Sequence, residues 1–292
     1  MIVFLILGIY IKIKFEKTKN KEAESLMFNQ QISAMLDIYN EPLNASSTEE
    51  NPPTATSENK TSPEVEARTN SVYLPILLYH YVEPLKKDDA LRASLTISPE
   101  IFEQQLELIN KSKFQTITMS QVASRVNGDF TKEKNIALTF DDGYRDFYEY
   151  VFPLLKKYQI KATVYVIYNA INAPDYLTED MIKEMMNSGL VEIGSHALDH
   201  KMLTSLNKNE AKRQVTLSKT LLEKRFKAPV ATIAYPYGSF NKAIAEYVEK
   251  AGYQAAVSVI AGEQQSEINR FFLARLRPVN NTNLIKKLAD SF

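Results

Sequence analysis

Two adjacent carboxylates near the middle of the chain carry the first chemical signal. Asp141 and Asp142 directly follow a short apolar segment, residues 136–140, and precede a glycine in the string TFDDG. Gly143 permits a sharp turn that would expose both side chains. Neighbouring carboxylates repel each other unless a cation or a shared proton relieves the repulsion. By itself the string is typical of a turn or of a helix start.

Two histidines later in the chain give this pair a partner. His196 and His200 follow a second apolar segment, residues 191–195, in the string SHALDH. Their spacing brings both imidazoles to one side of a helical turn. Two imidazoles and a carboxylate form a recurring catalytic zinc set that leaves coordination positions for water and substrate. Such a histidine pair alone is equally typical of surface or capping residues, so the metal-site prediction rests on the combination.

Two further strings end predicted strands. The string AYPYG, residues 234–238, is by itself a turn. His80 ends the first predicted strand in the string LLYHY, where an isolated histidine is more often a satisfied core residue than a catalyst. The chain has 3 histidines and no cysteine, which excludes disulfides and thiolate nucleophiles. Any metal site must therefore use histidine and carboxylate.

The overall charge balance argues against a strongly charged partner. Lys plus Arg and Asp plus Glu number 35 each, so the formal net charge is zero. No long-range field then favours nucleic acid or an anionic surface. We expect a neutral partner, no nucleic acid, and a monomer.

The first 71 residues differ in composition from the rest. Residues 1–11 are almost wholly apolar, and closely spaced lysines follow up to residue 21. This run is shorter than the about 20 residues that span a bilayer, and the lysines after it argue against export by the positive-inside rule. We still expect residues 1–21 to be an apolar signal or membrane-anchor segment, with its orientation open. Residues 22–71 are predicted as a short helix and a disordered linker, rich in Ser, Thr, Glu, Asn and Pro from residue 44.

Strand-like and helix-like segments alternate through the predicted catalytic domain, residues 72–292. The predicted strands are residues 73–79, 114–118, 136–140, 162–167, 191–195, 231–235 and 255–259. The predicted helices are residues 99–112, 119–126, 146–158, 178–188, 208–227 and 241–251. This alternation predicts an α/β fold with a mostly parallel sheet, either doubly wound or closed as a (β/α) barrel, and about seven strands favour the barrel. In such folds the chemistry gathers at the carboxyl ends of the strands.

The strings TFDDG, SHxxxH and YPYG, in this order, resemble the polysaccharide deacetylase family, the NodB-like carbohydrate esterases, across about residues 72–279. The resemblance implies a distorted (β/α) barrel and a divalent metal. It implies Asp141 as general base and Asp142, His196 and His200 as metal ligands. It also implies that the backbone N–H of Tyr237 contributes to the oxyanion hole.

Two departures from the common family pattern point to one branch. The family has an arginine, which orients the base, where this chain has Ala234, and this chain has no histidine after His200 to serve as general acid. Both features resemble the poly-β-1,6-N-acetylglucosamine deacetylases. That branch takes its acid from a Tyr-His motif, which His80 matches. It also has a late arginine in a Leu-x-Arg context, which Arg275 resembles and which would orient the base.

The resemblance implies metal-dependent N-deacetylation of an N-acetylated glycan polymer, either poly-β-1,6-N-acetylglucosamine or peptidoglycan, at the extracellular face of a bacterial cell. An O-acetyl polysaccharide esterase and a non-catalytic glycan-binding module on the same fold are the alternatives. Zn²⁺ is the expected metal, with Co²⁺ or Ni²⁺ as substitutes. The chain has no tryptophan, so stacking on the sugar must come from Tyr or Phe, for example Tyr144, Tyr235 or Tyr237. We also expect Pro236 to contact the sugar.

Overall fold

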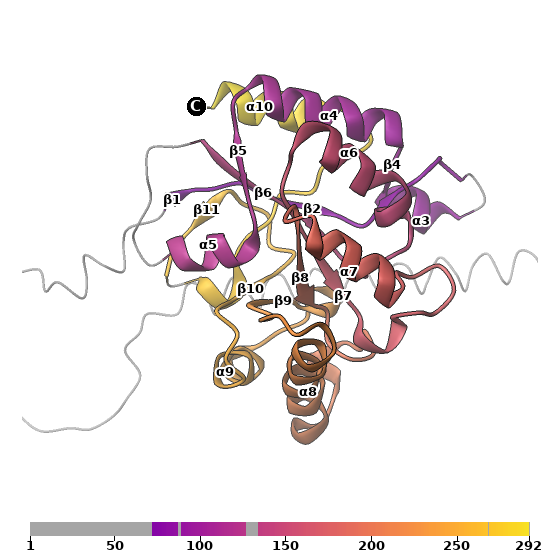
Figure 1. Cartoon of the computed structure of the whole chain (residues 1–292). Helices are drawn as coiled ribbons and strands as arrows, with labels where there is room; N and C mark the ends of the chain where they lie inside the picture. The colour runs from indigo at the N-terminus through magenta and orange to yellow at the C-terminus, as the bar shows by residue number, and fades with distance from the viewer. Residues whose placement is uncertain (1–71, 87–88, 127–133, 268, 292) are drawn as a thin grey trace, which may run out of the picture. The chain divides into compact units, whose positions relative to one another are not determined.

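A computed structural model of the chain describes residues 72–86, 89–126, 134–267 and 269–291 (Figure 1). The predicted apolar segment, residues 1–21, and the predicted helix and linker, residues 22–71, lie outside this described part. Across the described ranges, every helix is too short or too polar to cross a membrane.

A seven-stranded parallel sheet forms the centre of the fold. Its strands are ordered β10-β9-β8-β7-β6-β2, and β5 pairs alongside β6. The strands are β2 (Ile76–Tyr79), β5 (Gln115–Ile117), β6 (Asn135–Phe140), β7 (Ala162–Val166), β8 (Val191–Ser195), β9 (Thr232–Ala234) and β10 (Ala255–Val257). Parallel registers run throughout, for example Ile76 opposite Ala137 and Ala162 opposite Val191. All seven predicted strands of the sheet are thus present, although the first is shorter than expected.

An irregular segment closes the gap between the first and last strands of this sheet. Leu273 bridges to Val257 on β10, and Leu276 bridges to Leu77 on β2, both in parallel. The backbone N–H of Leu276 donates to Ile76, and that of Leu78 donates back to Leu276, at 2.8 and 2.9 Å. The sheet therefore curls into a distorted (β/α) barrel, as the sequence predicted.

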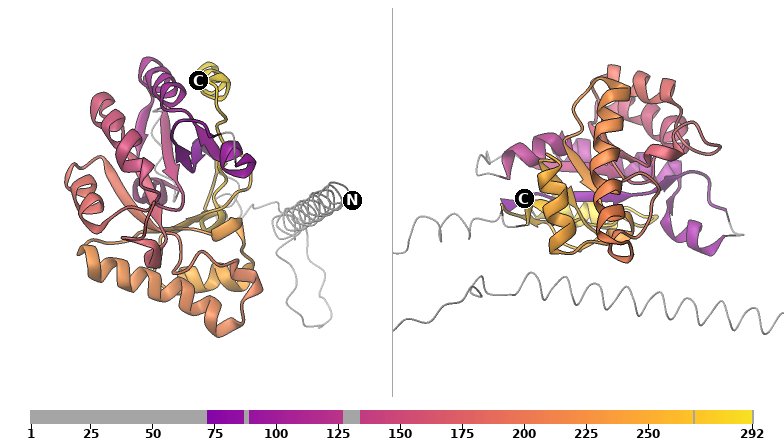
Figure 2. Two further views of the ribbon diagram at one scale, coloured as in Figure 1. Left: turned by 90° about the vertical axis from the view of Figure 1, so that its right-hand side faces the viewer. Right: turned by 90° about the horizontal axis from the view of Figure 1, so that it is seen from below.

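Helices cover the outside of the curled sheet (Figure 2). They are α3 (Ala90–Leu95), α4 (Pro99–Lys111), α5 (Met119–Arg125), α6 (Phe152–Tyr158), α7 (Glu179–Asn187), α8 (Lys208–Phe226), α9 (Lys242–Lys250) and α10 (Asn283–Asp290). Several begin at a side-chain cap: Ser98, Thr178 and Asn207 each accept a hydrogen bond from the third residue of their helix. Two small sheets complete the fold, β1 (Val72–Tyr73) with β11 (Gln264–Gln265) and β3 (Tyr81–Val82) with β4 (Thr96–Ile97).

Prolines account for two differences from the predicted elements. The predicted strand at residues 73–79 is divided into β1 and β2, because Pro75 between them has no N–H for a sheet ladder. The predicted helix at residues 146–158 starts as a π-helix, η1 (Phe147–Val151), before α6. Pro153 cannot donate to the carbonyl of Glu149, so the regular helical ladder is interrupted there.

The core lies inside the barrel, where small residues make room for a large ring. Tyr165 on β7 is fully buried, and its hydroxyl lies 3.1 Å from Oγ1 of Thr232 on β9. Gly194 on β8, between these strands, leaves the space for the ring, since a Cβ there would collide with it. Such side chains fill the barrel interior, so the chemistry must lie at its rim.

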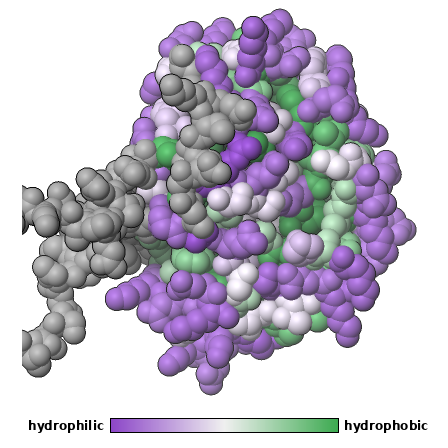
Figure 3. Space-filling view, turned by 60° about the vertical axis from the view of Figure 1, so that its left-hand side comes forward, coloured by the Kyte–Doolittle hydropathy of each residue, from purple (hydrophilic) through white to green (hydrophobic). Residues whose placement is uncertain are grey.

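On the face shown in Figure 3, hydrophilic residues predominate and hydrophobic ones form a smaller strip between them.

Candidate active site

The carboxyl ends of the parallel strands bring the predicted chemical residues to one edge of the barrel. Asp141 and Asp142 follow β6, His196 follows β8, and His80 follows β2. Arg275 comes from the irregular segment that closes the barrel. Residues up to 195 positions apart in the chain therefore share one site, because parallel strands all end at the same edge.

The side chains of Asp142, His196 and His200 converge on a common point. Oδ1 of Asp142 lies 3.4 Å from Nε2 of His196 and 3.2 Å from Nε2 of His200. The ligand atoms of all three residues lie within 4.8 Å of one another. Oδ1 of Asp142 is buried and accepts no hydrogen bond from the described residues. Two imidazole nitrogens and one unbonded carboxylate oxygen fit a divalent cation.

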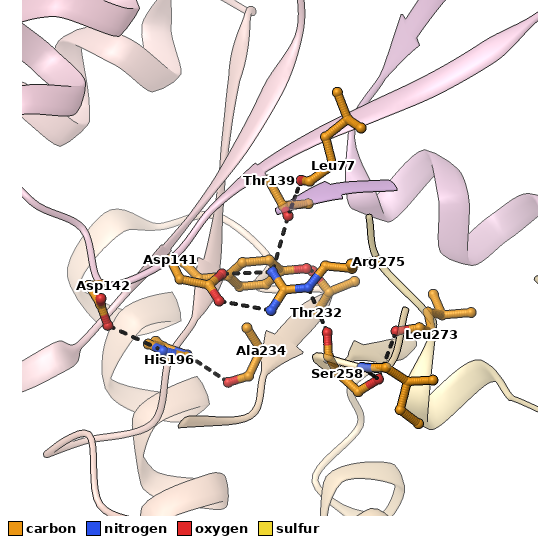
Figure 4. A network of polar contacts seen from close by, with 12 residues as sticks. Leu77, Thr139, Asp141, Asp142, His196, Thr232, Ala234, Ser258, Leu273 and Arg275 are labelled. Atoms are coloured by element: carbon orange, nitrogen blue, oxygen red, sulfur yellow. Dashed lines mark hydrogen bonds and ion pairs between the residues drawn. The ribbon is translucent and has the colours of Figure 1, made fainter. Parts of the chain in front are cut away.

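The hydrogen bonds and pKa values of these groups also suit metal binding. Nδ1 of His196 lies 2.8 Å from the carbonyl oxygen of Ala234, which leaves Nε2 free to act as a ligand (Figure 4). Burial, together with the neighbouring His196, lowers the pKa of His200 to about 4, so its ring is neutral at pH 7. Burial would raise the pKa of the Asp142 carboxyl, but the two histidines lower it below its ordinary value. His200 and Asp142 thus have the protonation states that ligands need. Burial would lower the pKa of His196, but the carboxylates of Asp142 and Asp141 raise it above its ordinary value, so this ring gives up its proton when a metal binds.

Asp141 lies beside this cluster in a bidentate ion pair. Its side chain is 3% exposed, and its two oxygens accept from Nη1 and Nη2 of Arg275, both at 2.8 Å. Arg275 is fixed in turn, because Nε donates to the carbonyl of Ser258 at 2.8 Å and Nη1 donates to Oγ1 of Thr139 at 3.1 Å (Figure 4). Burial would raise the pKa of Asp141, but the Arg275 charge and hydrogen bonds lower it. Asp141 is therefore a buried, ionised carboxylate in a fixed position.

His80 lies close enough to the two carboxylates for their charges to act on it. Burial lowers the pKa of its imidazole, while Asp141 and Asp142 oppose this shift. The next residue, Tyr81, is held in β3, where the N–H of Val82 donates to Oδ2 of Asp146 at 2.5 Å. His80 thus lies between two strands, β2 and β3, and both of its chain neighbours are held in place.

Four tyrosines line the rim, and two of them, Tyr81 and Tyr176, were not expected from the sequence. Tyr144 stacks on Tyr81 with ring centroids 4.1 Å apart, and Tyr176 follows at 5.1 Å. Tyr237 is 55% exposed, and its ring centroid lies 4.5 Å from that of His200. These four side chains give the rim an aromatic lining.

Tyr235 and Pro236 lie in the segment that directly follows β9. Both are buried, and the Tyr235 hydroxyl donates to the carbonyl of Phe271 at 2.8 Å. The Tyr235 ring stacks on Phe240 with centroids 4.9 Å apart. Tyr235 therefore packs in the interior through its ring and its hydroxyl, and the sugar contact expected for Tyr235 and Pro236 stays a prediction.

Comparisons with known proteins give the family of this chain. Residues 128–256 match the family model described as polysaccharide deacetylase. A Bacillus subtilis (strain 168) relative named for the same family, YxkH, is 33% identical over 205 residues, which cover 70% of this chain and 71% of the relative. This chain belongs to the polysaccharide deacetylase family. The deacetylase is also 29% identical over 195 residues to the poly-β-1,6-N-acetyl-D-glucosamine N-deacetylase of Staphylococcus aureus (strain MRSA252), covering 62% of this chain and 67% of that one.

Solved structures of relatives have the same fold. The Streptococcus pyogenes deacetylase PplD, solved in complex with acetate, aligns with a TM-score of 0.71 and 28% identity, covering 75% of the deacetylase and 99% of PplD. IcaB from Ammonifex degensii aligns with a TM-score of 0.65 at 23% identity, and the alignment covers 74% of this chain and 95% of IcaB. The deacetylase is therefore a hydrolase of amide bonds on the barrel that these relatives share.

Sequence reasoning missed the residues that hold the functional side chains. Thr139 and Ser258 fix Arg275, and Tyr81 and Tyr176 extend the stack on Tyr144. Tyr81 could have been found, since it adjoins His80 at the same strand end. Tyr176 lies in a loop without a motif, and only its bridge to Tyr144 brings it to the site.

Proposed function

We propose that the deacetylase removes N-acetyl groups from a polysaccharide containing N-acetylglucosamine and releases acetate. Poly-β-1,6-N-acetylglucosamine is the first substrate and peptidoglycan the second. The observation that carries the proposal is the buried, ionised Asp141, held by Arg275 beside the cluster of Asp142, His196 and His200. The Staphylococcus aureus relative named for this activity supports the choice of polymer.

The metal site of this proposal consists of Asp142, His196 and His200. Zn²⁺ suits two nitrogen ligands and one oxygen ligand, and Co²⁺ or Ni²⁺ can replace it. Such an ion, when bound, supplies Lewis-acid polarisation of the acetyl carbonyl and of water. Among the described residues, this is the one cluster of three or more His, Asp or Glu side chains that could hold a metal ion.

The reaction then depends on proton transfers between side chains already in place. Asp141 is the general base that takes a proton from the attacking water, and Arg275 keeps it ionised and oriented. The backbone N–H of Tyr237 donates to the developing oxyanion, a contribution typically worth about 3 kcal/mol. Tyr237 adopts a left-handed backbone at φ 57°, which is uncommon for a non-glycine residue. His80 is the general acid that passes the proton taken up by Asp141 on to the departing amine, because burial lowers the pKa of its imidazole and leaves it no proton of its own to give.

A substrate with a good leaving group separates the role of His80 from that of Asp141. Replacing His80 by alanine is expected to lower kcat for glycan deacetylation by about 10²-fold to 10⁴-fold. The same variant should lose much less activity toward an activated aryl acetate, whose leaving group departs without a proton. Acetate release from both substrates by the wild type and His80→Ala measures the difference. An equal loss on both would remove His80 from the acid role.

A panel of polymers tests the substrate. The purified chain is incubated with poly-β-1,6-N-acetylglucosamine, peptidoglycan and O-acetylated xylan, and released acetate is measured. We expect release from the first polymer at a higher kcat/KM than from the second. Release from acetylated xylan alone would instead support the O-acetyl esterase, which uses the same residues with a different leaving group.

We also propose a domain arrangement and a location. Residues 1–21 export or anchor the chain, residues 22–71 link it, and residues 72–292 act as a monomeric catalytic domain at the extracellular face of a bacterial cell. The apolar composition of the first segment and the polymer in the name of the Staphylococcus aureus relative support this arrangement. Protease added to intact cells should therefore remove the catalytic domain, and complete protection would contradict the location.

A further inference from the structure

Gln214 connects helix α8 to the loop that carries both metal-site histidines. Its side chain is 0% exposed. Its Oε1 accepts from the backbone N–H groups of Leu198 and Asp199, each at 3.1 Å. Its Nε2 donates to Oδ2 of Asp199 at 2.6 Å and to Oε1 of Glu210 at 2.9 Å. Both lone pairs and both N–H groups of the amide are therefore used.

The loop that Gln214 holds has a strained backbone. Ala197 and His200 have φ angles of 60° and 54°, in the left-handed region that non-glycine residues seldom adopt. Such conformations persist only where the surrounding structure fixes them. Leu198 and Asp199, the two residues that donate to Gln214, lie directly between the two strained positions.

The opposite side of the loop is fixed by the segment after β7. The backbone N–H groups of Tyr168 and Asn169 donate to the carbonyls of Ala197 and Leu198 at 3.2 and 3.1 Å. The Asn169 side chain also donates to Oδ1 of Asp199. Asp199 thus accepts from Asn169 on one side and from Gln214 on the other, so the loop is held between two elements of the barrel.

We propose that Gln214 is a positioning residue that sets the affinity of the metal site without contacting the metal. The inference rests on the proposed function, since it takes His196 and His200 as ligands. Only an amide can accept from the two loop N–H groups and donate to two carboxylates at once. Glutamate would lose both donations and place a third carboxylate beside Asp199 and Glu210. Leucine would leave the loop N–H groups buried without a partner.

A matched control exists on another helix. Gln105 on α4 is also 0% exposed, and its side chain bonds to the Tyr79 hydroxyl and to the carbonyls of Val279 and Asn281. It lies outside the histidine loop. Gln105→Leu therefore removes a buried, bonded glutamine of the same kind without touching the predicted ligand geometry.

The test measures zinc affinity and stability separately. The full chain is stripped of metal, and its zinc dissociation constant is measured by competition with a chromophoric chelator for the wild type, Gln214→Leu, Gln214→Glu and Gln105→Leu. We expect zinc binding to weaken about 10-fold to 100-fold in both Gln214 variants. Gln105→Leu should lower the Tm of the metal-free protein and leave the dissociation constant unchanged. Gln214→Glu has nearly the wild-type size and carries the test if Gln214→Leu does not fold.

The outcomes separate this inference from the proposed function. Gln214 variants that bind zinc as tightly as the wild type would overturn the inference while the metal site stands. So would Gln105→Leu if it weakened binding as much. A wild-type chain that binds no zinc would overturn the metal site itself, and the inference with it. Activity of Gln214→Glu should also recover as zinc is raised, whereas that of Asp141→Asn should not.

Discussion

Replacing Asp141 by asparagine is expected to lower kcat for acetate release by about 10²-fold to 10⁴-fold, the range typical of a lost general base. Asparagine has nearly the same shape but cannot take a proton, and because it also leaves the Arg275 charge unpaired, kcat is compared for variants shown to be folded. The metal ligands Asp142, His196 and His200 are unchanged, so the zinc dissociation constant should stay close to that of the wild type. Steady-state kinetics and zinc titration on the same preparation measure both.

Asp146→Asn is the matched control for this variant. Asp146 is also a buried aspartate in the segment after β6, but burial raises the pKa of its carboxyl to about 7. Its charge at neutral pH is therefore already partly lost, and asparagine should change kcat only a few-fold. A kcat for Asp141→Asn within tenfold of the wild type would remove Asp141 from the base role.

Replacing Arg275 by methionine is expected to destabilise the protein strongly. The substitution leaves Asp141 buried and unpaired, and breaking a buried ion pair by removing one partner costs about 3 to 5 kcal/mol. Activity should fall as well, because Arg275 is the one side chain among the described residues that donates to the carboxylate of Asp141. Arg275→Lys keeps the charge but loses the bidentate geometry. Compared with Arg275→Met, it should therefore recover much of the stability but little of the activity.

The stability lost in Arg275→Met should depend on pH. Arg275 holds the folded-state pKa of Asp141 below its ordinary value, so the stability from this carboxyl is present above about pH 4 and is lost only as the pH falls further. In Arg275→Met burial raises the folded-state pKa, so the variant loses stability as the pH rises through that value. The free energy of unfolding in urea should therefore differ most from that of the wild type at pH 7 and less at pH 5.

The double variant Arg275→Met with Asp141→Asn separates the charge from the packing. Asparagine removes the unpaired charge, so the double variant should be more stable at pH 7 than Arg275→Met alone. Additive losses of stability, or an equal effect at both pH values, would contradict the account of this pair.

The site was predictable where chemistry follows a strand directly in the sequence. TFDDG and SHALDH each end an apolar strand, and the carboxyl ends of parallel strands meet at one edge. The alternation of strands and helices therefore predicted the barrel and the meeting of the aspartate pair with His196 and His200, and the family resemblance chose Asp142 as the third ligand. The local signal was sufficient because only local spacing and strand direction were needed.

Contacts between distant segments were not predictable from spacing. Asp141 and Arg275 are 134 positions apart, and Arg275 lies on a segment that forms only single bridges to its neighbours. Resemblance to a family branch suggested Arg275, but its geometry follows from how the barrel closes. Gln214 gave no signal either, because its position on α8 does not reveal which loop it faces. Tyr235 was expected at the sugar because the chain has no tryptophan, but composition does not reveal that its hydroxyl donates to the carbonyl of Phe271.

Metal-dependent release of acetate is the most direct test of the proposed mechanism. The full chain is treated with a chelator, dialysed, and assayed on poly-β-1,6-N-acetylglucosamine before and after stoichiometric zinc is added, beside the variant His200→Ala. We predict that the stripped wild type releases almost no acetate, that zinc restores release, and that zinc does not restore it in the variant. Full activity in the stripped wild type, with its metal content verified as negligible, would contradict the assignment of Asp142, His196 and His200 as a catalytic metal site.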